Sequence, residues 1–198
     1  LKVPESKITV VYQGCHQAFK QEYTEAEKAA VRAKYHLPAC FVLNVGAIEP
    51  RKNALEIVKA IAPLSDLSLV LVGAQTAYYQ QIVAYCKAHN LSDRVLALKG
   101  VSMQELAMIY QQAEVFCYPS VFEGFGIPII EALFSRVPVI TSEGSCFAEA
   151  GGAHSCYISL DKAADEIREA IVRISSDRLL REEMIEKGYA HAQHFTDE

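Results

Sequence analysis

Residues 115–134 read VFCYPSVFEGFGIPIIEALF and contain a complete strand–loop–helix unit. The apolar run at residues 115–118 is typical of a short buried strand, and a loop with two glycines follows it. Pro128 stands where the first turn of a helix accepts proline, and the apolar residues after it predict a helix over residues 127–135. The unit therefore predicts a buried strand that leads through a glycine-rich loop into a helix.

The same alternation of short apolar runs and amphipathic stretches extends over most of the chain. Each run is apolar at nearly every position, as expected for a parallel strand that is covered on both faces. We expect strands at residues 8–12, 40–45, 67–72, 95–98, 115–118 and 138–141. We expect helices at residues 24–36, 53–64, 77–89, 102–111 and 127–135, and two more within 161–194 that are separated near 175–177. This order predicts an α/β fold, a doubly wound, Rossmann-like parallel sheet with C-terminal helices.

Composition restricts the classes of function. The 198 residues are 51% hydrophobic, carry a formal net charge of -5 and contain no block of Lys or Arg, which argues against a sequence-independent nucleic-acid surface. No apolar run approaches the roughly 20 residues of a membrane span. The start, LKVP, resembles neither a signal peptide nor an initiating Met, so we expect a fragment of a longer chain. Six cysteines without C-x-x-C spacing favour reduced thiols and a cytoplasmic location.

Ligands of doubly wound sheets bind beyond the carboxyl ends of the strands, so the segments after the predicted strands are the candidate sites. The first is GAIEPRKN at residues 46–53, where Gly46 allows close backbone approach. Arg51 and Lys52 are adjacent cations just before Asn53, the predicted N-cap of the next helix. Two cations beside a helix N-terminus suit a diphosphate, although an isolated pair of this kind is more often a solvated turn.

The second candidate is the turn formed by Gly100, Val101 and Ser102. Ser102 and Glu105 have the spacing of a capping box, which predicts a helix start. A nucleotide base would fit against Val101, but the segment also suits a plain strand-to-helix turn.

The third candidate lies within residues 120–131. Gly124 and Gly126 leave the backbone free to present N–H groups to a ligand. Glu131 stands among apolar residues of the predicted helix, and a buried carboxylate there needs hydrogen-bond donors. The two hydroxyls of a ribose would supply them; Arg136 or a backbone amide is the alternative. Glu123 precedes the glycines and, taken alone, reads as a solvated loop acid.

Together these segments resemble the retaining glycosyltransferases of family 4, which have the GT-B fold. The resemblance covers nearly the whole chain but only the second half of such an enzyme. The most specific match is the E-x7-E motif from Glu123 to Glu131, in the setting S-x-x-E-G-F-G-x-P-x-x-E-A. The supporting matches are YQG at 12–14, GAIEPRKN at 46–53, PVI at 138–140 and FTDE at 195–198. Ala47 stands where many members of the family have an arginine, which is a departure from the pattern.

The resemblance implies a role for each matching residue. Arg51 and Lys52 would neutralise the donor diphosphate as it leaves, and Glu123 would hold the donor sugar. The substrate-binding residues that it implies are Gly14, Gly46, Val101, Gly124, Phe125, Gly126, Ile127 and Glu131. Among these, Val101 would contact the base and Glu131 the ribose. The donor would be a UDP-, GDP- or ADP-sugar, with no cofactor and no metal.

The implied reaction transfers a sugar to an acceptor hydroxyl with retention of the anomeric configuration, as in glycan or polysaccharide assembly. The missing N-terminal domain would bind the acceptor, which would be a glycan or lipid-linked glycan. Any contact with the inner face of the membrane would also be made by that domain. The isolated chain, residues 1–198, would then be a donor-binding domain with little transferase activity of its own. A nucleotide-sugar epimerase of GT-B type and a non-catalytic doubly wound binding module are the alternatives.

Overall fold

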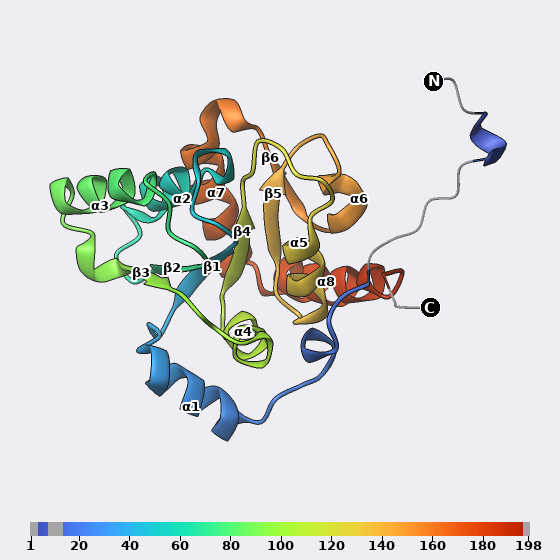
Figure 1. Cartoon of the computed structure of the whole chain (residues 1–198), viewed down its shortest axis with the longest axis horizontal. Helices are drawn as coiled ribbons and strands as arrows, with labels where there is room; N and C mark the ends of the chain where they lie inside the picture. Colours follow the sequence, from blue (N-terminus) through green and yellow to red (C-terminus); the bar gives the residue numbers. More distant parts are fainter. Residues whose placement is uncertain (1–3, 8–13, 196–198) are drawn as a thin grey trace.

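The computed structural model of this chain describes residues 4–7 and 14–195. The strand expected at residues 8–12, most of the YQG segment and residues 196–198 lie outside the described residues. The described part contains a six-stranded parallel sheet flanked by helices (Figure 1). The sheet confirms the predicted α/β class and the parallel pairing.

The strands closely follow the predicted apolar runs. They are, in chain order, β1 (Phe41–Val45), β2 (Ser68–Val72), β3 (Val95–Leu98), β4 (Val115–Tyr118), β5 (Val139–Ser142) and β6 (Cys156–Ile158). Their order across the sheet is β3-β2-β1-β4-β5-β6, with Leu43 of β1 beside both Val70 of β2 and Phe116 of β4. The direction of the strand order reverses between β1 and β4, which is the point where doubly wound sheets bind their ligands.

Helices cover both faces of the sheet. They are α1 (Glu25–Tyr35), α2 (Ala54–Ile61), α3 (Tyr79–Ala88), α4 (Met103–Tyr110), α5 (Ile127–Phe134), α6 (Phe147–Gly151), α7 (Ala163–Ser176) and α8 (Arg178–Ala192). Apolar side chains of α1, α4 and α5 pack in one core with Leu43 and Phe116, and those of α2, α3 and α7 pack in a second core with Val42 and Leu71. Two buried layers explain why each strand is apolar on both sides.

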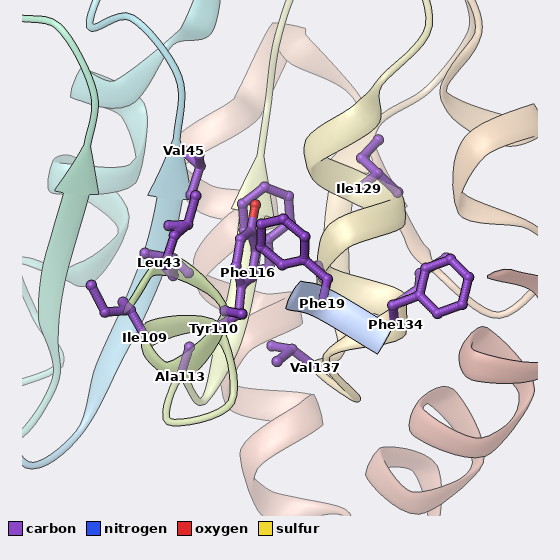
Figure 2. Close-up of a cluster of buried hydrophobic side chains, with 14 of the residues drawn as sticks. Phe19, Leu43, Val45, Ile109, Tyr110, Ala113, Phe116, Ile129, Phe134 and Val137 are labelled. Carbon is purple, nitrogen blue, oxygen red and sulfur yellow. The ribbon is translucent and has the colours of Figure 1, made fainter. Parts of the chain in front are cut away.

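The core beside α4 and α5 is aromatic. Figure 2 shows Phe19, Tyr110 and Phe116 gathered in it, between the sheet and α5. The ring centroids of Phe19 and Tyr110 are 5.6 Å apart, and those of Tyr110 and Phe116 are 5.2 Å apart. The hydroxyl of Tyr110 is thereby held beneath α5, where it enters the candidate site.

One described strand and one described α-helix were not predicted. β6 has three residues and lies at an edge of the sheet, and α6 has five residues and ends in glycine. Elements this short lack the two or more periods that make an apolar pattern visible. The break between the last two helices falls at Asp177, within the predicted separation, and the Asp177 side chain caps α8. None of the described helices combines the length and the apolar character that crossing a membrane needs.

Candidate functional site

The loops after β1 and β4 are joined by hydrogen bonds at the point where the strand order reverses. The Val121 amide donates to the Arg51 carbonyl oxygen at 2.8 Å, and Arg51 Nη1 donates to the Phe122 carbonyl oxygen at 2.9 Å. Asn53 Nδ2 donates to the Pro119 carbonyl oxygen at 3.0 Å. These bonds make the two loops one unit at the carboxyl edge of the sheet.

Asn53 has a different role from the one predicted. It directly precedes α2, as an N-cap does, but its side chain makes no capping hydrogen bond. Its backbone is in the left-handed conformation, with φ of 53°. The amide that would cap the helix instead ties the first loop to the loop after β4.

A cluster of ionised side chains forms where the two loops meet. One carboxylate oxygen, Glu123 Oε1, lies 2.7 Å from Arg51 Nη1 and 2.7 Å from Lys52 Nζ. Arg51 Nη2 also lies 2.7 Å from Glu49 Oε1. The Lys52 side chain is only 8% exposed and that of Glu123 11%. Glu123 is therefore largely buried and paired, and the solvated alternative for this residue is excluded.

The two cations determine whether Glu123 is ionised. Burial by itself raises the pKa of Glu123, but hydrogen bonds from Arg51 and Lys52 outweigh it and lower the pKa to about 2. Glu123 is consequently ionised at neutral pH. Arg51 is half exposed while Lys52 is buried, so the cluster presents one cation to solvent and keeps the other covered.

Glycines at the ends of β1 and β2 permit the close packing around this cluster. A Cβ on Gly46, whose φ is 129°, would lie 3.1 Å from both Cε and Nζ of Lys52. A Cβ on Gly73 would lie 2.0 Å from the Gly46 carbonyl oxygen. The two strand ends approach one another and the lysine at distances that a side chain would prevent.

Glu131 lies in the second turn of α5 and is buried, as predicted for an acid in an apolar helix. Its Oε2 accepts a hydrogen bond from the Tyr110 hydroxyl at 3.0 Å. Burial raises its pKa to about 7, against the lowering effect of that bond. The alternative pairing with Arg136 is not formed, because Arg136 turns toward Glu22 and Glu186. Glu131 therefore keeps unusual capacity to accept hydrogen bonds.

The glycine loop lies between Glu123 and Glu131. Gly126 has φ of 116° and directly precedes α5, which begins at Ile127. Gly124 is exposed, with no atom within 4 Å of a Cβ placed on it. The Phe125 ring packs edge-on against Phe195, with centroids 5.6 Å apart, so its side chain is used to anchor the loop. Any ligand contact of this loop would then come from its backbone.

Val101 lines a pocket at the carboxyl ends of β1, β2 and β3. The pocket has a volume of about 450 Å³, and its walls include Val45, Gly46, Lys99 and Leu106. It shares Gly46 with the surroundings of Lys52. A flat, mostly apolar ring such as a nucleobase is of a size to enter it. A separate polar concavity of about 310 Å³ lies at Ser135 and Arg136, and none of the predicted site residues lines it.

Gly14 lies before β1, apart from the strand-end loops and α5 that contain the other predicted substrate-binding residues. It directly precedes the buried Cys15, and residues 8–13 before it lie outside the described part. Its role in donor binding stays a prediction.

Two tyrosines belong to the site although the motifs did not point to them. Tyr110 contacts Glu131, and Tyr118 at the end of β4 contacts Lys52. A buried tyrosine needs a hydrogen-bond partner for its hydroxyl. Tyr110 and Tyr118 both stand among apolar residues, so the sequence could have indicated that each hydroxyl has a polar partner. Across residues 4–7 and 14–195, no group of three or more His, Cys, Asp or Glu side chains is placed to hold a metal ion.

Comparison with known sequences assigns most of the chain to one family. The family model described as glycosyl transferases group 1 matches residues 27–191. The O-antigen chain mannosyltransferase RfbU of Salmonella typhimurium is 30% identical over 88% of this chain and 49% of its own length. The O-antigen chain mannosyltransferase B of Escherichia coli is 27% identical over 98% of this chain and 52% of its own length. This chain spans about half the length of these curated relatives.

Solved structures share the fold at low sequence identity. A glycosyltransferase from Rickettsia africae superposes with a TM-score of 0.85 at 18% identity, over 98% of this chain and 54% of that one. The C-terminal domain of a group 1 glycosyl transferase from Francisella tularensis superposes with a TM-score of 0.75 at 18% identity, over 92% of this chain and 98% of that one. The Anabaena protein HepE, solved in complex with UDP and glucose, gives a TM-score of 0.84 at 17% identity, over 97% of this chain and 54% of that one.

These comparisons agree with the predicted resemblance in fold and in family. The sheet and its flanking helices have the fold of the C-terminal half of a GT-B glycosyltransferase. The family match covers the loops after β1 and β4 together with the E-x7-E segment. The chain belongs to the group 1 glycosyltransferases.

Proposed function

We propose that this chain is the donor-binding half of a retaining glycosyltransferase and binds a nucleotide diphosphate sugar in the crevice between the loops after β1 and β4. The observation that carries the proposal is the pairing of Arg51 and Lys52 on a single oxygen of Glu123, at the reversal of strand order. Ligands of doubly wound sheets bind at that place, and two convergent cations there suit a diphosphate. The family match supports a transferase.

The residues have distinct roles in the proposed reaction. Arg51 and Lys52 contact the diphosphate, and the charge that develops on the leaving oxygen is stabilised by both. The bond from the anomeric carbon to this oxygen breaks while the acceptor oxygen forms the new bond, and the acceptor proton passes to the leaving phosphate. Glu123 and the backbone of Gly124, Phe125 and Gly126 hold the donor sugar. Protein cations meet the phosphate charge, so no metal is needed.

The nucleoside occupies the other side of the crevice. Glu131 accepts hydrogen bonds from the ribose hydroxyls, which supply the donors that a buried carboxylate lacks. The base enters the pocket beside Val101, and the diphosphate connects the two positions past Gly46. Gly14 and Ile127 add backbone contacts. Solved neighbours of this fold include HepE with UDP-glucose, which supports a nucleotide sugar as the ligand class.

The acceptor is bound by a part of the protein beyond this chain. The Salmonella and Escherichia coli relatives are about twice as long as this chain, and both are named O-antigen chain mannosyltransferases. We propose that the whole protein adds a sugar to a glycan or lipid-linked glycan at the inner face of the membrane, as a step of polysaccharide assembly. The alternatives are a nucleotide-sugar epimerase of the same fold and a non-catalytic doubly wound binding module, which would have no affinity for nucleotides.

Calorimetric titration with UDP, GDP and ADP and with their glucose and mannose conjugates tests the proposal. We expect one nucleotide series to bind, and to raise the unfolding free energy by about 2.7 kcal/mol at a ligand concentration of 100 Kd. Lys52→Met should weaken this binding, whereas Lys87→Met, a change of an exposed lysine on α3, should not. The absence of heat and of thermal shift with every nucleotide would overturn the proposal. Rapid sugar transfer by the 198-residue chain alone would contradict the assignment to a donor half.

A further inference from the structure

The ammonium group of Lys52 is buried, and its position depends on few contacts. Glu123 Oε1 lies 2.7 Å from Nζ. The Tyr118 hydroxyl accepts a hydrogen bond from the same Nζ, which also lies 4.5 Å from the centroid of the Tyr118 ring. A buried cation is costly unless it is paired and hydrogen-bonded. Glu123 supplies the opposite charge, and Tyr118 supplies a neutral acceptor.

Tyr118 is among the most rigidly held residues of the site. It is the last residue of β4 and is 1% exposed. Its ring stacks on Phe116 at 5.6 Å and meets Phe147 edge-on at 6.4 Å. Its carbonyl oxygen accepts a hydrogen bond from Thr141 Oγ1 at 2.9 Å, which ties it to β5. The hydroxyl is therefore held in one place by the sheet and not by a loop.

Gly46 bounds Lys52 from another side. Its missing side chain leaves the space that Cε and Nζ occupy, since a Cβ there would be 3.1 Å from both atoms. The lysine is thus confined between the end of β1 and the end of β4. This confinement directs Nζ to the junction of the two loops, where Glu123 meets it.

We propose that Tyr118 is the positioning residue that keeps Lys52 aimed at the diphosphate when the donor replaces Glu123 on the two cations. This inference rests on the proposed function of the crevice. A phosphate oxygen and the Glu123 carboxylate compete for the same two cations, so Glu123 has to release them when the donor binds. Tyr118 lies beneath Lys52 and has no such conflict.

The chemistry of the tyrosine suits this role. Burial raises the pKa of the Tyr118 hydroxyl well above its ordinary range, and the nearby Glu123 charge adds to the effect. The hydroxyl therefore stays neutral, and it accepts from Lys52 without cancelling the charge that the phosphate needs. A carboxylate at this place would hold the lysine equally well but would weaken its attraction for an anion.

The first test compares nucleotide affinities in a double-mutant cycle of Tyr118→Phe and Lys52→Met. Titrations with UDP and GDP, and with UMP and GMP, give the contribution of the outer phosphate. We expect Tyr118→Phe to weaken binding of the diphosphate about tenfold and that of the monophosphate much less. In the Lys52→Met background the same change should have no further effect. Tyr157→Phe is the matched control, because its hydroxyl bonds the Gly152 carbonyl oxygen elsewhere.

The second test needs no nucleotide and so separates this inference from the proposed function. The Lys52 side-chain NMR signals of the unliganded chain should be distinct and should move toward those of exposed lysines in Tyr118→Phe, but not in Tyr157→Phe. If no nucleotide binds the wild type but the Lys52 signals still move in Tyr118→Phe, the proposed donor site is wrong, whereas the contact that positions Lys52 is supported. The inference is overturned if the Lys52 signals do not move, if Tyr118→Phe leaves diphosphate affinity unchanged, or if its effect persists without Lys52.

Discussion

The Tyr110 hydroxyl donates a hydrogen bond to Glu131 Oε2 at 3.0 Å, and it links α4 to α5 beneath the crevice. Tyr110 is fully buried in the aromatic core with Phe19 and Phe116 (Figure 2). A carboxylate placed over this core loses most of its hydration, and one tyrosine hydroxyl replaces only part of it. The raised pKa of Glu131, about 7, is the electrostatic consequence.

This pKa predicts an unusual dependence of stability on pH. Between pH 4.5, the ordinary pKa of the group, and about 7, the folded state binds more protons at Glu131 than the unfolded state does. The unfolding free energy should therefore fall as pH rises through this window, by at most about 3 kcal/mol from this residue. The side chain in Glu131→Gln cannot ionise, so we expect the variant to be more stable than the wild type at pH 8 and similar to it near pH 4.5. Urea unfolding at the two pH values measures the difference.

Glu169→Gln is the control for this measurement, because Glu169 is exposed on α7. It should follow the wild-type pH profile. If the profile of Glu131→Gln also runs parallel to the wild type, Glu131 does not have a raised pKa.

Ribose binding should depend on the same carboxylate. Ribose hydroxyls donate to the ionised form, so we expect affinity for a nucleoside diphosphate to increase as pH rises through about 7. Removal of one hydroxyl, in a 2′-deoxynucleoside diphosphate, should weaken binding about tenfold at pH 8. Both effects should disappear in Glu131→Gln, and calorimetry at pH 6 and pH 8 measures them. Equal affinities for the ribo and deoxy forms would show that Glu131 does not bind the ribose hydroxyls.

Glu123 should show the opposite behaviour to Glu131. Its pKa is lowered to about 2, so the stability it contributes is present above pH 4.5, its ordinary pKa, and is lost as pH falls toward 2. Glu123→Gln removes the carboxylate that pairs with buried Lys52, and we expect a loss of about 2 kcal/mol at pH 7.

The same variant should bind anions more readily. No carboxylate competes with phosphate for Arg51 and Lys52 in Glu123→Gln, so UDP or GDP should stabilise it more than the wild type. Thermal melting with and without the nucleotide gives both quantities. An unchanged or smaller nucleotide-induced shift in the variant would show that Glu123 does not occupy the phosphate position.

Close approach of the strand ends predicts a severe effect of a single methyl group. Gly73→Ala would place a Cβ 2.0 Å from the Gly46 carbonyl oxygen, and we expect a loss of stability of about 3 kcal/mol. Gly100→Ala is the matched change, because Gly100 has φ of 66° but no atom within 4 Å of the added group. It should cost about 1 kcal/mol from backbone strain alone. Equal costs in chemical denaturation would show that Gly73 does not lie this close to the Gly46 carbonyl oxygen.

The amino-acid sequence by itself determined the layers of this protein. Strands that are apolar at successive positions require cover on both faces, so the runs ending at Val45, Val72, Leu98 and Tyr118 were sufficient to predict a parallel sheet between two layers of helices. Local chemistry was readable as well. Ser102 and Glu105 form the predicted capping box, because its bonds join residues three apart. The short elements β6 and α6 escaped, because they contain too few residues to show a period.

Only the tertiary structure decided which of these residues meet. Arg51 and Glu123 are distant in the chain, and they pair because β1 lies beside β4 in the sheet and not beside another strand. The partner of Glu131 was likewise open: Arg136 is nearer in sequence, but burial of Tyr110 under α5 brings its hydroxyl to the carboxylate. Strand neighbours are chosen by the packing of whole layers, a collective free energy that no local pattern contains.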